Sequence, residues 1–199
     1  MQLLETIRFN LGRLSNLELH QKRLNNSRKA LFNCEDGIIL DSALSNFVAK
    51  TQRHELFKCR VIYDTKIRSV EFVPYKTPVI NSLKIVRCNE IEYSHKYAVR
   101  DKINNLMAQK GNVDDIIIVK NGLITDSSFA NLLFYNGEHW LTPTFPLLKG
   151  TQRAKLLAQD QIISADIRPS DLSNFTKVRL VNAMLRFEDE MDVMIEKIY

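Results

Sequence analysis

The hydrophobic and polar positions of this chain show two periodicities, which alternate from one segment to the next. Runs with a two-residue period predict strands, whereas apolar residues spaced three or four apart predict helices. LLETIRFNLGRL, folded back at Gly12, predicts a hairpin, and residues 20–32 and 41–52 predict helices, the second with Asp41 as its N-cap. FKCRVIYD and SVEFVPY then alternate like strands. These elements predict a small N-terminal α+β module.

A second module begins after Pro74 and Pro78, which mark a linker and place the predicted domains at 1–78 and 79–199. LKIVRC predicts a strand, and residues 99–111 predict a helix that Gly111 ends. DDIIIVKNGLITDSSFANLLFYNGEHWLTP contains Asn-Gly pairs at 121–122 and 136–137, each between apolar runs. Since Asn-Gly favours the type I′ turn, this stretch predicts a three-stranded antiparallel meander with Asp126 in its middle strand. A helix over 150–163 is expected next.

Composition narrows the class of protein without naming a function. The chain has 199 residues, of which 45% are hydrophobic and 26% charged, as in ordinary globular proteins. Its net charge is +5, but the lysines and arginines are scattered, so a nucleic-acid partner is not indicated. The three cysteines are far apart, no CxxC or HExxH spacing occurs, and no apolar run is as long as a membrane span. We expect a cytoplasmic protein with free thiols, no metal and no membrane partner.

Three features of the second half carry possible chemistry, and each has an ordinary structural reading. Thr151 after Gly150 opens a helix whose free backbone N–H groups suit a phosphate, although such helix starts are common. Asp126 lies in a predicted strand, either on the wet face or buried against a cation, and the alternation of the strand does not decide between them. Lys96 is either an extended surface lysine or an amine held ready for a Schiff base.

Taken in order along the chain, these features resemble the class IV aminotransferases, which are the fold-type IV pyridoxal phosphate enzymes. LHQKRLNNS resembles the HxxRLxxS segment of the family, and HKYAVR resembles its lysine segment. LITDSSFANLLF resembles the strand with TExxxxNLF, LLKGTQR resembles LPGITR, and VNAM resembles the NAL of the lyases. The resemblance extends over most of the chain and is strongest over about 65 residues, from 93 to 157.

The resemblance implies a fold, a cofactor and a set of site residues. The fold is α+β, with a small N-terminal module and a larger C-terminal module built on an antiparallel, barrel-like sheet. The cofactor is pyridoxal 5′-phosphate, an electron sink at Cα of an amino substrate, and the assembly is a homodimer. Lys96 is the catalytic residue that holds the cofactor aldehyde. The other residues implied in cofactor binding are Arg23, Asp126, Thr151, Gln152 and Asn182. Two arginines, Arg60 and Arg100, are implied on the substrate side.

Three departures from the family pattern keep several functions open. The DRGxxYGD stretch that precedes the first strand of the family is not found, Asp126 stands where the family has glutamate, and NAMLRFED replaces a downstream loop of the transaminases. A lyase that eliminates pyruvate from a 4-amino-4-deoxychorismate-like substrate is narrowly favoured. An amino-acid transaminase on the same scaffold is the first alternative, and a non-catalytic cofactor-binding protein is the second.

Overall fold

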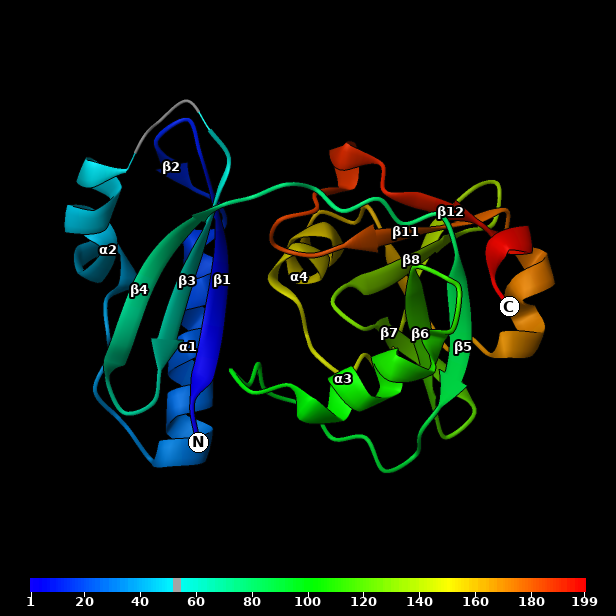
Figure 1. Cartoon of the computed structure of the whole chain (residues 1–199), viewed down its shortest axis with the longest axis horizontal. Coiled ribbons are helices and arrows are strands. Elements are labelled where there is room, and N and C mark those ends of the chain that lie inside the picture. The colour runs from blue at the N-terminus through cyan, green and yellow to red at the C-terminus, as the bar shows by residue number, and fades with distance from the viewer. Residues whose placement is uncertain (52–54) are drawn as a thin grey trace. The chain divides into compact units, whose positions relative to one another are not determined.

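The computed structural model describes residues 1–51 and 55–199, which form two compact units (Figure 1). Unit 1 contains residues 1–77 together with 95–99, and unit 2 contains residues 78–94 and 100–199. The chain therefore passes from unit 1 to unit 2 and returns briefly to unit 1 at residues 95–99. The sequence predicted a single boundary at residue 78. The structure differs in that residues 95–99, beyond this boundary, pack with the first module.

Unit 1 is a four-stranded antiparallel sheet of order β2-β1-β3-β4 with two helices on one face. Its strands are β1 (Leu3–Asn10), β2 (Arg13–Leu14), β3 (Phe57–Tyr63) and β4 (Ile67–Pro74). Its helices are α1 (Leu17–Phe32) and α2 (Leu40–Lys50). Alternate residues of β3 are buried, and Cys59 and Val61 pack with Leu24 of α1 and Leu44 of α2. The predicted hairpin is confirmed, with Leu11 and Gly12 both at positive φ.

The helix starts of unit 1 differ from the prediction. The first helix begins at Leu17, earlier than residue 20, after Asn16 in the left-handed region. The second begins at Leu40 behind Ile39 as N-cap, and Asp41 lies inside the first turn without capping it. Gln21 explains the earlier start of α2, since its side-chain oxygen accepts a hydrogen bond from the Leu40 N–H at 2.7 Å. The predicted end of this helix at residue 52 lies outside the described residues.

Unit 2 is built on a larger sheet of order β10-β9-β8-β7-β6-β5, with β11 paired to both β8 and β12. The first four strands are β5 (Leu83–Arg87), β6 (Asp115–Lys120), β7 (Leu123–Ser127) and β8 (Asn131–Tyr135). The others are β9 (Trp140–Pro143), β10 (Ile163–Ala165), β11 (Lys177–Val181) and β12 (Asp192–Met194). The β5–β6 and β9–β10 pairs are parallel and the rest antiparallel, so the sheet is mixed. The α+β fold class is confirmed.

The predicted three-stranded meander is wrong in one respect: its middle strand is two strands. Residues 128–130 form a tight turn between β7 and β8, in which the Ser127 hydroxyl accepts hydrogen bonds from the Phe129 and Ala130 N–H groups. Asn121 and Gly122 have positive φ, as a type I′ turn requires. The second Asn-Gly pair forms a longer loop, in which the Asn136 side chain accepts from two backbone N–H groups.

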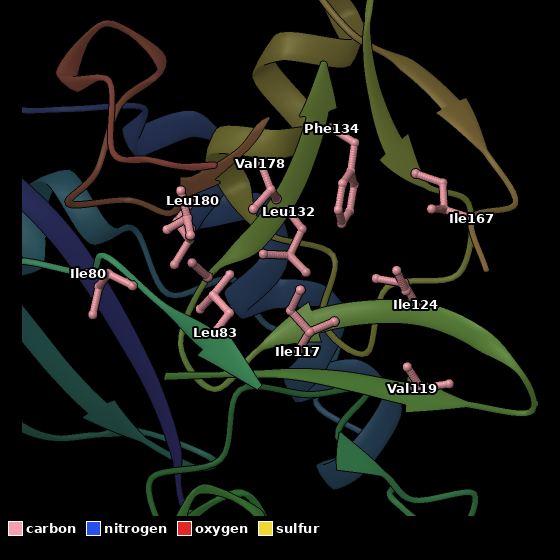
Figure 2. Packing of buried hydrophobic residues seen from close by; sticks show 12 residues of the cluster. Ile80, Leu83, Ile117, Val119, Ile124, Leu132, Phe134, Ile167, Val178 and Leu180 are labelled. Carbon is pink, nitrogen blue, oxygen red and sulfur yellow. The ribbon is translucent and has the colours of Figure 1, made fainter. Parts of the chain in front are cut away.

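Two α-helices and four short 3₁₀ helices complete the described part of unit 2. The α-helices are α3 (Asp101–Met107) and α4 (Thr151–Ala158), and the latter ends five residues before the predicted residue 163. The 3₁₀ helices are η1 (Ala108–Lys110), η2 (Pro169–Asn174), η3 (Phe187–Asp189) and η4 (Ile195–Lys197). Figure 2 shows the core of the unit, where Leu132, Phe134, Val178 and Leu180 belong to the same buried cluster as Ile117. None of the described helices combines the length and apolar character needed to cross a membrane.

Candidate cofactor site

The residues implied by the family resemblance are divided between the two units. Unit 1 contains Arg23, Arg60 and Lys96. Unit 2 contains Arg100, Asp126, Thr151, Gln152 and Asn182.

Arg23 lies on α1 and is bound by a carboxylate that the sequence interpretation did not single out. Its Nε donates to Glu5 Oε1 at 2.9 Å and its Nη2 donates to Glu5 Oε2 at 2.5 Å, which is a two-point ion pair. His20, one turn earlier on α1, donates from Nδ1 to Glu5 Oε2 at 2.6 Å. Glu5, on β1, is completely buried. Glu5 therefore fixes the plane of the Arg23 guanidinium.

The pKa values of this cluster follow from its charges. Burial would by itself raise the pKa of Glu5, but the Arg23 charge and the hydrogen bonds from His20 and Arg23 hold it at about 2. Burial lowers the pKa of His20 despite its bond to Glu5, so this imidazole is neutral at pH 7. The charges of Arg23 and Lys96 lower the His20 pKa further. Lys96 and Arg23 thus both lower the pKa of one buried histidine.

The segment that contains Lys96 is attached to β1 by its backbone. The Leu4 N–H donates to Lys96 O at 2.8 Å, and the Ala98 N–H donates to Gln2 O at 2.9 Å. The Lys96 side chain is half-buried. These backbone bonds hold the lysine beside the strand that supplies Glu5, independently of what its amine does.

Arg60 lies on β3, on the sheet face opposite the helices, since Cys59 and Val61 on either side of it point into the helix-facing core. It forms an ion pair of 3.6 Å with Glu71 of β4. The Arg60 side chain is 35% exposed and the Glu71 side chain 52%. This position does not decide whether Arg60 binds a substrate carboxylate. Its role stays a prediction.

In unit 2, Asp126 is buried on β7, which answers the question that strand alternation left open. Asn131 Nδ2 donates to Asp126 Oδ1 at 2.8 Å, and the Leu148 N–H donates to Asp126 Oδ2 at 2.8 Å. Burial raises the pKa of Asp126 to about 7, although these two hydrogen bonds and the charge of Arg153 oppose the rise. Both bonded donors are uncharged. A cation bonded to this carboxylate would therefore lower its pKa and relieve the cost of burying it.

The segment after β9 leads from Asp126 to the start of α4. Asn131 Nδ2 also donates to Leu148 O at 2.9 Å, so both backbone groups of Leu148 are bound by the Asp126–Asn131 pair. Gly150 is the N-cap of α4, and no side chain caps the helix. Thr151 and Gln152, in its first turn, are buried. The first turn of a helix has backbone N–H groups of a kind suited to an anion.

Arg100 and Asn182 both support the turn between β7 and β8. Arg100, at the start of α3, donates from Nη2 to Ser128 O. Asn182, directly after β11, donates from Nδ2 to Phe129 O at 3.2 Å, and its Oδ1 accepts from the N–H groups of Met184 and Leu185. These bonds give both residues a role in shaping the site. Their contacts with substrate or phosphate stay predictions.

Sequence reasoning missed several residues that organise the two clusters: Glu5, His20, Asn131, Leu148 and Arg153. His20, Asn131, Leu148 and Arg153 lie within the motifs that resemble the family, but no role was attached to them. Glu5 shares one face of β1 with Leu3, Ile7 and Phe9, so the strand pattern could have indicated that it is buried, but not which residues it binds. Its partners are 15 and 18 positions away, and only the packing of α1 on β1 brings them together.

The residues present fit pyridoxal phosphate. The phosphate requires cations and N–H donors, which Arg23 and the start of α4 supply in kind. The pyridine nitrogen requires a carboxylate, which Asp126 supplies. The aldehyde requires an amine, which Lys96 supplies.

Comparison with known proteins establishes the family. The amino-transferase class IV family matches residues 90–187. An uncharacterized protein of Haemophilus influenzae is 37% identical over 190 residues, which cover 92% of this chain and 97% of that protein. The chain belongs to the class IV aminotransferase family, a family of enzymes.

Solved structures agree with this assignment. A candidate 4-amino-4-deoxychorismate lyase of Haemophilus somnus is 37% identical, with a TM-score of 0.86 over 94% of this chain and 97% of that one. A candidate amino-acid aminotransferase of Mesorhizobium loti is 18% identical, with a TM-score of 0.83 over 100% and 99% of the two chains. A hypothetical aminotransferase of Mycobacterium tuberculosis in its pyridoxal phosphate-bound form, at 17% identity, has a TM-score of 0.76 and covers 99% and 81%. Pyridoxal phosphate is the cofactor of the family.

Proposed function

We propose that this protein is a pyridoxal phosphate-dependent lyase that eliminates pyruvate from a 4-amino-4-deoxychorismate-like substrate. The observation that carries the proposal is the buried Asp126 carboxylate, whose two bonded partners are uncharged. A protonated pyridine nitrogen is a cation of the right kind for it. The 37% identity to the Haemophilus somnus protein, whose name is that of the lyase, supports this choice of reaction.

Each residue has a separate task in this proposal. Arg23, oriented by Glu5, and the first turn of α4 neutralise the phosphate, and Asp126 keeps a proton on the pyridine nitrogen. When bound, pyridoxal phosphate supplies an electron sink for the bonds of the carbon that carries the substrate amine. The Lys96 amine would hold the cofactor aldehyde, and it would move the proton of the carbon that carries the substrate amine. Arg60 and Arg100 are assigned to the substrate carboxylates.

Binding and attachment are tested together. Purified protein is titrated with pyridoxal phosphate while the visible absorbance is recorded, then reduced with borohydride and mapped by peptide mass. We expect one absorbing species and a label on Lys96. Lys102, an exposed lysine of α3, serves as the internal control and should stay unlabelled. The absence of a band, or a label spread over exposed lysines, would reject the proposal in favour of a protein that has kept the fold without the cofactor.

The reaction type needs a second assay, because a transaminase on this scaffold would use the same lysine. Product formation is measured with and without an added keto acid. A lyase turns over without the keto acid, whereas a transaminase stops after one turnover unless an amino acceptor is present. The homodimer that the resemblance implies and the cytoplasmic location expected from composition belong to the same proposal. Sedimentation of the loaded protein tests the dimer.

A further inference from the structure

Asn131 contacts two segments of unit 2 that are far apart in the sequence. It is the first residue of β8, lies directly opposite Asp126 in the sheet register, and is buried with 5% of its surface exposed. Its two Nδ2 hydrogens go to different segments, one to Asp126 Oδ1 and one to Leu148 O. A single amide therefore joins the carboxylate on β7 to the segment that precedes α4.

The other side of the same amide fixes the start of the helix. A Cβ atom on Gly150 would lie 2.1 Å from Asn131 Oδ1, so the backbone at the N-cap of α4 packs directly against this oxygen. The φ of Gly150 is −68°, which any residue can adopt. Glycine is therefore required here by the close approach of Asn131, and its conformational freedom is not the reason.

The far end of the first helical turn is anchored independently. Arg153 of α4 donates from Nε to Thr142 Oγ1 at 3.0 Å and from Nη2 to Pro143 O at 2.8 Å. With Arg153 attached to β9 and Gly150 packed on Asn131, the first turn of α4 has little freedom to shift relative to β7. The position of the helix start is thus set jointly by these two contacts.

We propose that Asn131 is a positioning residue that couples Asp126 to the start of α4, so that the carboxylate and the anion-binding turn hold one fixed separation. The inference rests on the proposed function, in which these two features take the pyridine nitrogen and the phosphate of one cofactor. Asn131 acts in this proposal through its hydrogen bonds to Asp126 and Leu148. Replacing Asn131 should therefore weaken the binding of both the ring nitrogen and the phosphate, even though Asp126 and the first turn of α4 are unchanged in sequence.

The test compares cofactor binding in Asn131→Ala, Gly150→Ala and the double variant, using pyridoxal phosphate and pyridoxal as probes. The dissociation constant of pyridoxal divided by that of pyridoxal phosphate reports how well the phosphate is held, and the pH dependence of the bound visible band reports the ring nitrogen. We expect Asn131→Ala to reduce the ratio about tenfold, the loss produced when one or two buried hydrogen bonds disappear. The band should also titrate at a different pH.

Gly150→Ala changes the other side of the same contact and should give the same result, since the new methyl group displaces the Asn131 amide. The double variant should be no worse than Asn131→Ala alone, because removing the amide leaves room for the methyl group. Such non-additivity is expected only of residues in direct contact. Additive losses in the double variant would contradict the coupling.

Leu132→Ala is the matched control for a loss of stability alone. Leu132 is the next residue of β8, is completely buried, and belongs to the hydrophobic core of the unit. Its truncation should lower the melting temperature at least as much as Asn131→Ala while leaving the ratio of dissociation constants, pyridoxal over pyridoxal phosphate, and the titration of the band unchanged. If Asn131→Ala behaves like Leu132→Ala, Asn131 is only structural and the inference is wrong.

The inference and the proposed function fail in different ways. If the wild-type protein shows no visible band with pyridoxal phosphate, the proposed function is rejected. The melting temperatures of the ligand-free single and double variants then still test the coupling: non-additivity supports it and additivity overturns it. If the wild type binds the cofactor and Asn131→Ala keeps a normal ratio, the function stands and the inference is rejected.

Discussion

Glu5 in unit 1 and Asp126 in unit 2 are both buried carboxylates on strands, yet their pKa values lie on opposite sides of the ordinary range. Burial raises the pKa in both cases, and Glu5 is held at about 2 because Arg23 and His20 outweigh it. Asp126 has an amide and a backbone N–H as bonded partners, and its pKa is raised to about 7. The decisive difference is therefore a directly bonded cationic side chain, which only Glu5 possesses.

This difference separates two uses of a buried carboxylate. The charge of Glu5 is compensated within the chain, so it serves to orient Arg23. The charge of Asp126 is compensated only in part, which costs stability and suits the residue to a cationic ligand. Functional sites commonly contain groups whose burial is unfavourable until the ligand arrives.

The largest expected effect is on Glu5. Glu5→Gln leaves the Arg23 guanidinium and its surroundings without their anion, and breaking such a buried pair costs about 3–5 kcal/mol of unfolding free energy. Urea unfolding at pH 7 measures it. Glu5→Asp is the matched variant, which keeps the charge and shortens the side chain. A loss below about 1 kcal/mol for Glu5→Gln would show that the cluster is not compensated as described.

The second effect has the opposite sign. Asp126→Asn removes a buried charge with no bonded cation, and a pKa of about 7 instead of about 4 corresponds to roughly 4 kcal/mol. Since the amide can accept from only one of the two donors, we expect the ligand-free variant to be about 1–3 kcal/mol more stable at pH 8. Turnover should fall steeply, because the ring nitrogen loses its partner. A variant that is less stable at pH 8 would contradict the comparison.

Asp126→Glu restores the residue of the family at this position and is the control for function. It keeps the charge but adds one methylene group in a tightly packed place. We expect cofactor binding to persist in this variant and the stabilisation seen with asparagine to be absent.

The pH dependence of stability distinguishes the two carboxylates with a smaller effect. Glu5 has a lowered pKa, so its contribution is present above about pH 4 and is lost as the pH falls toward 2. Asp126 has a raised pKa, so it does not destabilise the fold below about pH 4. The fold loses stability as the pH rises from 4 through 7, because the unfolded carboxyl group ionises more easily than the buried one. The stability difference between wild type and Asp126→Asn should therefore grow between pH 4 and 7, by at most about 1.4 kcal/mol per pH unit. A constant difference across this range would show that Asp126 titrates normally.

The smallest effect is predicted for an exposed ion pair. Arg60 and Glu71 are 3.6 Å apart and substantially exposed, so Arg60→Gln should change the unfolding free energy by less than about 1 kcal/mol. If Arg60 binds a substrate carboxylate, the same variant raises KM and leaves cofactor binding intact. Glu71→Gln, which removes the other partner, should leave KM unchanged. Equal effects of both variants on KM would assign Arg60 to structure alone.

Local signals in the sequence predicted much of the fold. Strand alternation gave β3 and β4, and Asn121-Gly122 gave the turn between β6 and β7, because these features depend on neighbouring residues. The turn between β7 and β8 was missed because it contains no glycine or proline, and the Ser127 hydroxyl takes the place of such residues by binding two backbone N–H groups. The stretch LITDSSFANLLF therefore contains two strands where one was predicted.

The site was predictable as a set of residue types but not as an arrangement. Family motifs supplied Asp126 and the start of α4, but strand alternation could not place the Asp126 side chain inside or outside. The bonds that decide its charge come from Asn131 and from Leu148, 22 positions further on. The pairing of Glu5 with Arg23 likewise depends on how a helix packs on a strand. Contacts of this kind are set by tertiary packing, which the local pattern does not encode.

The most direct test of the account is a carboxyl-carbon NMR titration of Asp126, assigned with Asp126→Asn, in the ligand-free and the pyridoxal phosphate-loaded protein. We predict a pKa of about 7 without the cofactor and a fall to below about 5 when the protonated pyridine nitrogen supplies the missing cation. A pKa near 4 in the ligand-free protein, or one that does not change on loading, would contradict the claim that Asp126 is held for a cationic ligand.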